Sequence, residues 1–169
     1  MLDRLDLEPV FFAPFVSSVM RVEPAWIDYN GHLNMAYYNV LFDKAVDEAY
    51  ALAGIGETYM KKRLHSTFVA EVHVRYLREL HANDPVRVTF QLLDFDSKRL
   101  YFFKQLFHAT EGWVAATCES LSLHVDMQSK KTAAFPDDAK KTLKKMKDSH
   151  ARLPRPEAAG KRIMMPEKA

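Results

Sequence analysis

Residues 26–38 read WIDYNGHLNMAYY, and the rest of the fold can be built outward from this stretch. An acidic residue, Asp28, ends an apolar, strand-like run; an Asn-Gly turn follows, and an apolar helix begins at Met35. This order places a carboxylate beside the free N–H groups of a helix N-terminus, where the positive end of the helix dipole favours negative charge. Such a site could attack a carbonyl group and stabilise the oxyanion that forms.

The segments on either side of this stretch predict a strand and a long helix. Residues 15–27 alternate well enough for a strand, whereas residues 35–53 carry apolar side chains at helical spacing. Asn39, Asp43 and Asp47 form only a narrow polar stripe on this helix. Most of the helix surface therefore has to be covered by other parts of the protein.

The next part of the chain predicts antiparallel strands joined by short turns, after a helical or irregular link at residues 57–63. In the first of these strands, Phe68, Val72 and Tyr76 share one face because side chains alternate along a strand. The expected strands span residues 67–80, 86–95, 100–109 and 113–125.

One strand, one central helix and then consecutive antiparallel strands indicate an α+β fold. A curved antiparallel β-sheet wrapped around the central helix would hide the helix's apolar surface. We expect this sheet-and-helix domain to span residues 1–135. Residues 136–169 are expected to form a lysine-rich helix, at 136–150, and an extended tail of the same domain.

The composition of the 169 residues fits one domain with a single core. A net charge of +2 gives no strong field to attract nucleic acid. No apolar run approaches the roughly 20 residues of a membrane span, and the acidic, proline-containing N-terminus does not read as a signal peptide. The single cysteine, Cys118, cannot form an internal disulfide. We therefore expect a cytoplasmic protein that binds neither membranes nor nucleic acid.

Each polar residue of the opening stretch also has a purely structural explanation. Asp28 could be a turn residue, His32 could be a hydrogen-bonded structural residue, and Asn34 is a good N-cap candidate. A turn alone, however, does not require Asp, Gly, His and Asn together. Other catalytic signatures, including a nucleophile elbow, a dinucleotide fingerprint and a P-loop, are absent, and the spacing of the histidines does not predict a metal site.

The motif as a whole resembles the signature of hotdog-fold acyl-CoA thioesterases of the 4-hydroxybenzoyl-CoA thioesterase type, over roughly residues 16–127. The positions that carry the resemblance are Asp28-x-x-Gly31-His32-x-Asn34-x-x-Tyr37. The resemblance implies a hotdog fold, in which a sheet wraps round a central helix, and the hydrolysis of an acyl-CoA to a free acid and CoA. It also implies a homodimer or homotetramer with sites near the interface.

The resemblance assigns roles to single residues. Asp28 matches the catalytic aspartate, which would attack the thioester carbonyl or activate a water. Met35 matches the helix-start residue whose N–H polarises that carbonyl, and Gly31 matches the turn glycine. His32 and Asn34 match a motif that would orient the aspartate or the substrate. No cofactor is implied, since a thioester is already activated.

A narrower resemblance concerns the acyl group. The segments VEPAWIDYNGHLNMAYY, EVHVRYL, QLLDFDSKRLYFF and LSLHVD are similar to thioesterases that accompany carnitine dehydrogenase and act on betainyl-CoA. Aromatic faces hold a trimethylammonium group well, so Trp26 and Tyr37 are candidate substrate-binding residues. Packing in the core is the alternative explanation for these rings, and on a buried helix it is the better one for Tyr37. Trp26 also stands where many relatives carry a second aspartate, so no second acid is assigned.

The CoA nucleotide needs cationic partners for its phosphates. Lys98 and Arg99 lie together at a predicted strand turn and could bind them, although a solvated pair of charges explains them equally well. Two other functions stay open from the sequence: a non-catalytic acyl-CoA-binding hotdog protein, and a hotdog enoyl-CoA hydratase. An assay for thiol release separates all three.

Overall fold

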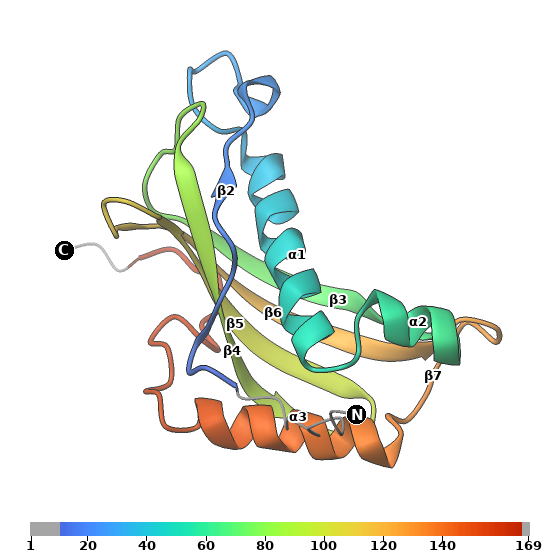
Figure 1. The fold of residues 1–169 in the computed structure, drawn as a ribbon. Helices are drawn as coiled ribbons and strands as arrows, with labels where there is room; N and C mark the ends of the chain where they lie inside the picture. Colours follow the sequence, from blue (N-terminus) through green and yellow to red (C-terminus); the bar gives the residue numbers. More distant parts are fainter. Residues whose placement is uncertain (1–10, 167–169) are drawn as a thin grey trace, which may run out of the picture.

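The computed structural model describes residues 11–166, which form one antiparallel sheet and three α-helices (Figure 1). The strands are β1 (Phe15–Val16), β2 (Met20–Arg21), β3 (His65–Tyr76), β4 (Pro85–Phe95), β5 (Arg99–His108), β6 (Val114–Asp126) and β7 (Lys131–Thr132). The helices are α1 (Met35–Leu52), α2 (Glu57–Arg63) and α3 (Asp137–His150), with a short 3-10 turn at Pro24–Trp26. The predicted α+β class is confirmed.

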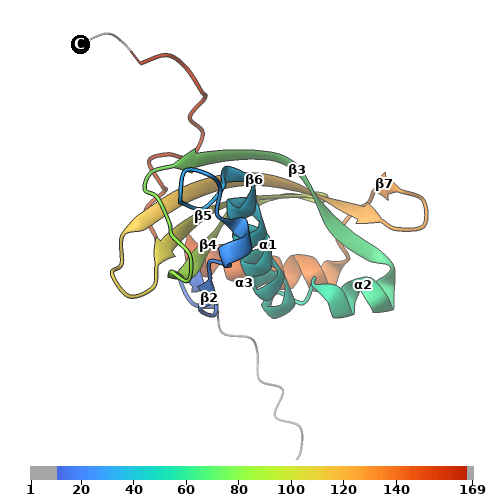
Figure 2. The same ribbon diagram turned by 90° about the horizontal axis from the view of Figure 1, so that it is seen from above.

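The sheet runs in the order β1-β4-β5-β6-β3, with β2 added beside β4 and β7 beside β6. Seen from above, it arches over α1 (Figure 2). One face of α1 is buried against the sheet through seven side chains: Tyr38, Leu41, Phe42, Ala45, Val46, Ala49 and Tyr50. The arch thus confirms the predicted sheet wrapped around a central helix.

The expectation that most of the surface of α1 would be covered was wrong for the single chain. Tyr37 and Val40 each keep 36% of their surface exposed, and Asn39, Asp43 and Asp47 are exposed as well. The sheet ends at β3, and no further strand within residues 11–166 continues it around the helix. It therefore covers only one side of α1. The exposed side of α1 thus carries both apolar and acidic side chains, and Asp43 and Asp47 border a cavity with the beginning of β3.

The predicted strand at residues 15–27 was also wrong, because this segment forms only β1, β2 and the turn at Pro24–Trp26. Pro24 has no N–H to donate to a sheet and favours the start of a helical turn. Both short strands pair with β4, so the segment still lies along one edge of the sheet.

In β3, the predicted common face of Phe68 and Val72 was wrong. The pairing of β3 with β6 shifts between Val69 and Glu71, so that Phe68 lies opposite Leu123 whereas Val72 lies opposite Ser120. A bulge adds one residue and moves the following side chains to the other face. Val72 therefore points to the α1 side and Phe68 to the outer side of the sheet.

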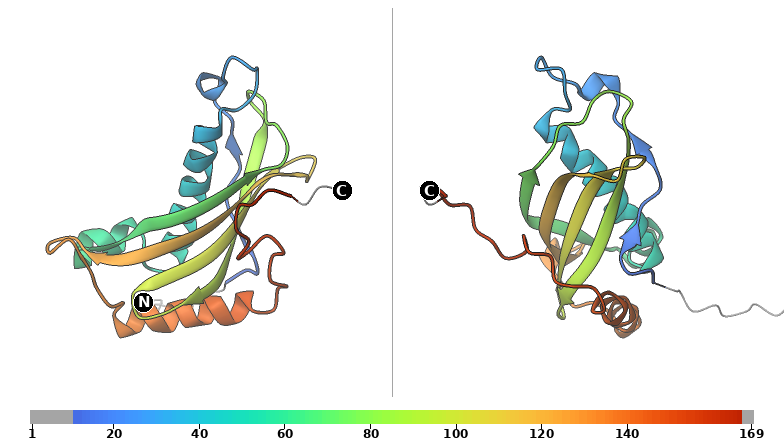
Figure 3. Two further views of the ribbon diagram at one scale, coloured as in Figure 1. Left: turned by 180° about the vertical axis from the view of Figure 1, so that it is seen from behind. Right: turned by 90° about the vertical axis from the view of Figure 1, so that its left-hand side faces the viewer.

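The helix at the C-terminal end packs on the same core as α1. Leu143 and Met146 of α3 are buried in a cluster with Tyr50 and Phe90. The segment after α3 is not extended throughout, as the sequence suggested, because it turns at Pro156–Ala159 and crosses the outer face of the sheet (Figure 3). There Gly160 donates its N–H to Glu119 on β6.

No helix within residues 11–166 is long and apolar enough to cross a membrane.

Candidate active site

The loop between the 3-10 turn and α1 is closed by hydrogen bonds around Asp28. Its N–H donates to the carbonyl oxygen of His32 (3.1 Å), and its own carbonyl accepts from Gly31 (3.0 Å). The side-chain oxygen Oδ1 accepts from the N–H of Asn30 at 2.8 Å. Gly31 has φ +86°, a left-handed conformation that favours glycine. Asp28 is therefore a turn residue, as its structural explanation predicts, and the turn uses one of its two carboxylate oxygens.

The start of α1 is capped by Asn34, whose Oδ1 accepts from the N–H of Ala36 at 2.9 Å. The N–H of Asn34 donates to the carbonyl of Trp26, which fixes the helix start against the 3-10 turn. Among residues 11–166, the N–H of Met35 has no acceptor. The first turn of a helix leaves such donors open, and the helix dipole makes them favourable partners for an oxyanion.

A pocket of about 340 Å³ opens at this helix start. It is lined by Asp28, His32, Leu33, Met35, Tyr38, Tyr76, Leu77, Arg78 and Glu79. Three of the residues that the sequence predicted as catalytic, namely Asp28, His32 and Met35, thus border one cavity. The arrangement offers a carboxylate and an open backbone donor to the same bound group.

The far wall of the pocket comes from the end of β3 and the loop after it. Tyr76 donates its hydroxyl hydrogen to the carbonyl of Met35 at 3.1 Å, and its ring meets Tyr38 edge-on at 5.0 Å between ring centroids. Burial raises the pKa of Tyr38 to about 12 and also raises that of Tyr76. Both phenols therefore stay neutral at physiological pH and can act only through their hydroxyl groups.

Two charged residues at the pocket follow Tyr76. Glu79 lies 3.7 Å from Nε2 of His32, and the guanidinium of Arg78 lies over the Trp113 ring at 4.1 Å. Sequence reasoning missed Tyr76, Arg78 and Glu79 as pocket residues, because they are separated from Asp28 by about fifty positions and form no motif. EVHVRYL, which ends at Leu77, was the one sequence signal in this region.

Four predicted residues surround the pocket without lining it. Gly31 and Asn34 shape the turn and the helix start, as described above. Trp26 and Tyr37 stack on each other, with ring centroids 5.6 Å apart and planes 11° apart. Nζ of Lys44 lies 5.3 Å from the centroid of the Trp26 ring, which is 9% exposed. The Trp26 ring thus already lies against an aromatic ring and a cation, and one face of Tyr37 is covered by Trp26.

The structure does not bring Lys98 and Arg99 to this pocket. They lie where β5 begins. The pocket, by contrast, lies near the other end of β5: its loop is next to the start of β4, and the start of β4 pairs with His108, the last residue of β5. The ten residues of β5 span about 30 Å at 3.3 Å per residue. Arg99 is also held by Asp96, with an Nε–Oδ2 distance of 2.7 Å.

Residues 11–166 contain no group of three or more His, Cys, Asp or Glu side chains that could hold a metal ion.

Known proteins resemble this chain over most of its length. The family model of the thioesterase-like superfamily matches residues 22–143. A betainyl-CoA thioesterase from Pseudomonas aeruginosa is 34% identical over 145 residues, which are 86% of this chain and 91% of that protein. An L-carnitine dehydrogenase/betainyl-CoA thioesterase from Rhizobium meliloti is 35% identical over 143 residues, 85% of this chain. The chain spans less than a third of that longer relative, since the match covers 29% of it.

A hypothetical protein from Staphylococcus aureus, solved in complex with CoA, superimposes with a TM-score of 0.83 at 26% identity, over 95% of this chain and 100% of the other. The sheet order, the arch over α1 and this similarity identify the hotdog fold that the sequence predicted. The family model spans most of the chain and includes both Asp28 and the whole of α1. The chain therefore belongs to the thioesterase-like superfamily.

Proposed function

We propose that this protein hydrolyses the thioester of a small acyl-CoA, giving a free acid and CoA. The observation that carries the proposal is that Asp28 and Met35 border one pocket, with the Met35 N–H open at the start of α1. The names of relatives that match most of the chain support it. Their names also support betainyl-CoA as the substrate.

In the proposed reaction, the thioester carbonyl oxygen accepts the N–H of Met35 with the dipole of α1 behind it. Asp28, whose Oδ1 is held by Asn30, uses its other oxygen to attack the carbonyl carbon or to deprotonate a water that attacks it. The C–S bond then breaks and CoA leaves as the thiolate. Where water attacks, this step gives the free acid directly; where Asp28 attacks, it leaves a mixed anhydride on Asp28, which a water molecule hydrolyses to the free acid and the restored carboxylate. His32 orients the carboxylate or the substrate from the same pocket.

We further propose that the protein acts as a homodimer, or as a tetramer of two dimers, in the cytoplasm. The edge strand β3 supports this, because its exposed side chains include Phe68, Val69, Val72 and Tyr76, each 43–54% exposed. An open apolar edge tends to pair with another strand.

The experiment that tests the function is thiol release from a panel of acyl-CoAs, followed with a chromogenic disulfide. Hydrolysis predicts catalytic release of one thiol per acyl-CoA. Tight binding without thiol release would indicate a non-catalytic acyl-CoA-binding protein. Addition of water to an enoyl-CoA without CoA release would indicate a hydratase, and either result would contradict the proposal.

A further inference from the structure

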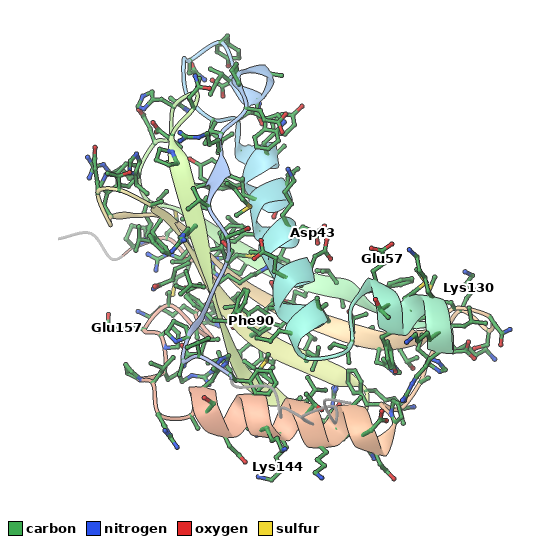
Figure 4. All side chains as sticks on the ribbon, viewed as in Figure 1. Asp43, Glu57, Phe90, Lys130, Lys144 and Glu157 are labelled. Atoms are coloured by element: carbon green, nitrogen blue, oxygen red, sulfur yellow. The ribbon has the colours of Figure 1, made fainter. Side chains whose placement is uncertain are left out.

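A second pocket, of about 420 Å³, lies between α1, α2 and the beginning of β3. Three carboxylates line it: Asp43 and Asp47 from α1, and Glu57 from α2. Figure 4 shows Asp43 and Glu57 on the same side of the molecule, in the angle between the two helices. The mechanism proposed above uses none of these groups, and we call this cavity the acidic pocket.

Two buried hydroxyl groups that line the acidic pocket make no hydrogen bond of normal length and angle among residues 11–166, although the Ser122 and Thr67 side chains lie close enough to the Tyr50 hydroxyl to oppose the rise of its pKa on burial. The two hydroxyl groups are Tyr50 Oη and Ser122 Oγ, on side chains that are 8% and 1% exposed. Buried hydroxyls in folded proteins are nearly always hydrogen-bonded. A polar or charged ligand in this cavity would give both hydroxyls a partner.

The charge of the acidic pocket favours a cation. Within residues 11–166, Asp43 and Asp47 take part in no salt bridge, whereas Glu57 is paired with Lys61. Burial, with the neighbouring carboxylates of Asp43 and Glu57, raises the pKa of Asp47. A positively charged group in the pocket would relieve this repulsion.

In a single chain, the acidic pocket is too far from Asp28 to hold the acyl group of the same substrate. From Met35 to Asp43 and Tyr50 the rise along α1 is about 12 and 22 Å, at 1.5 Å per residue. Both pockets, however, border β3. Tyr76 lines the Asp28 pocket, and Ser66 lines the acidic pocket at the other end of the strand.

An antiparallel pairing of β3 with its copy would bring the two pockets together. Tyr76 and Ser66 both lie five residues from Glu71. With the two-fold axis near Glu71, Tyr76 of one chain would lie opposite Ser66 of the second copy. In that dimer the Asp28 pocket of one chain would face the acidic pocket of the other across the shared sheet.

We propose that the acidic pocket of one copy holds the positively charged acyl group of a substrate whose thioester lies in the Asp28 pocket of the other copy. Asp43 and Asp47 supply the negative charge, and the Tyr50 and Ser122 hydroxyls direct their oxygens at the cation. The inference rests on the proposed thioester hydrolysis and makes these residues determinants of specificity. Because the charge sits on the acyl group, CoA esters of neutral acids lack this contact.

The test compares kcat/KM for betainyl-CoA and for tert-butylacetyl-CoA, which has the same shape without the charge. The unsubstituted protein should prefer the cation at least about tenfold, equivalent to about 1.4 kcal/mol. The double variant Asp43→Asn/Asp47→Asn should lose most of this preference, through slower betainyl-CoA hydrolysis, while tert-butylacetyl-CoA is hydrolysed as before. Asp137→Asn on α3, whose side chain is 98% exposed, controls for a change of net charge far from the pocket.

Equal losses on both substrates, or a preference that survives in the double variant, would overturn the inference and leave thioester hydrolysis standing. Hydrolysis of both esters at equal rates by the unsubstituted protein would overturn it too. If neither ester nor any other acyl-CoA releases thiol, the proposed function itself fails, and this inference fails with it.

Discussion

Asp28 accepts the N–H of Asn30 through Oδ1 at 2.8 Å, while its Oδ2 has no hydrogen-bond or ion-pair partner among residues 11–166. One carboxylate oxygen therefore builds the turn and the other stays available to the pocket. The structural and the chemical explanations of this residue are compatible. The division also makes an isosteric substitution informative, because an asparagine keeps an acceptor oxygen for the turn.

Asp28→Asn should fold with an unchanged Tm but lower kcat by at least about a hundredfold, the usual scale for losing a positioned base or nucleophile. The amide still accepts from Asn30, whereas it can neither deprotonate water nor attack a thioester. Steady-state thiol release and a thermal melt provide the two measurements. Near-normal turnover in a correctly folded variant would contradict the proposed role of Asp28.

Arg78 should matter for the CoA nucleotide more than the cations predicted from sequence. It lines the Asp28 pocket, whereas Lys98 and Arg99 lie where β5 begins, at the distant end of that strand. Because phosphates need cationic partners, Arg78→Gln should raise KM for an acyl-CoA several-fold and leave a short pantetheine thioester unaffected. The matched control is Lys98→Ala/Arg99→Ala, and a larger KM effect from this pair would restore the sequence-based assignment.

The edge of β3 should control assembly. Val69 and Val72 are 54% and 46% exposed in the single chain, so a lysine at both positions would place charges inside a β3–β3 interface. Light scattering should give twice the 19.5 kDa chain mass, or a multiple of it, for the unsubstituted protein and the monomer for Val69→Lys/Val72→Lys. Ile163→Lys, at an exposed tail position, should leave the mass unchanged. A monomeric unsubstituted protein at micromolar concentration would rule out the dimer.

His150 should make stability depend on pH. Its Nδ1 accepts the N–H of Leu92 and its Nε2 donates to the carbonyl of Phe12, each at 2.9 Å, which requires a neutral ring. Burial lowers the pKa of His150, while the unfolded residue keeps a pKa of about 6.5. The unfolded chain therefore binds more protons below about pH 6.5, and the free energy of unfolding falls as the pH decreases through that range.

Urea denaturation at pH 7.5 and pH 5.5 measures this dependence. His150→Gln should be less stable at both pH values, by about 1–3 kcal/mol for lost buried hydrogen bonds. The free energy of unfolding of this variant should also differ less between pH 7.5 and pH 5.5 than that of the unsubstituted protein. Burial lowers the pKa of His124 as well, so part of the slope should remain in the variant. If the variant's free energy of unfolding changed with pH as much as that of the unsubstituted protein, His150 would be excluded as a source of the pH dependence.

Local sequence patterns were sufficient for most of the elements. The predicted helix at residues 35–53 is found as Met35–Leu52, since Asn34 caps its start and Gly54 takes a positive φ just after its end. The pattern failed in β3, where alternation alone placed Phe68 and Val72 on one face. The bulge that separates them depends on how β3 pairs with β6, which β3 does not encode by itself.

The sequence by itself determined one wall of the candidate site. Asp28 and Met35 are seven residues apart, and the turn and helix cap between them are local structures built by short-range hydrogen bonds. Only the tertiary structure decided which residues form the opposite wall, how far Lys98 lies from this pocket, and that Asp43 and Glu57 line a common cavity. These depend on sheet register and on the angle between helices, which arise from packing among residues distant in the chain.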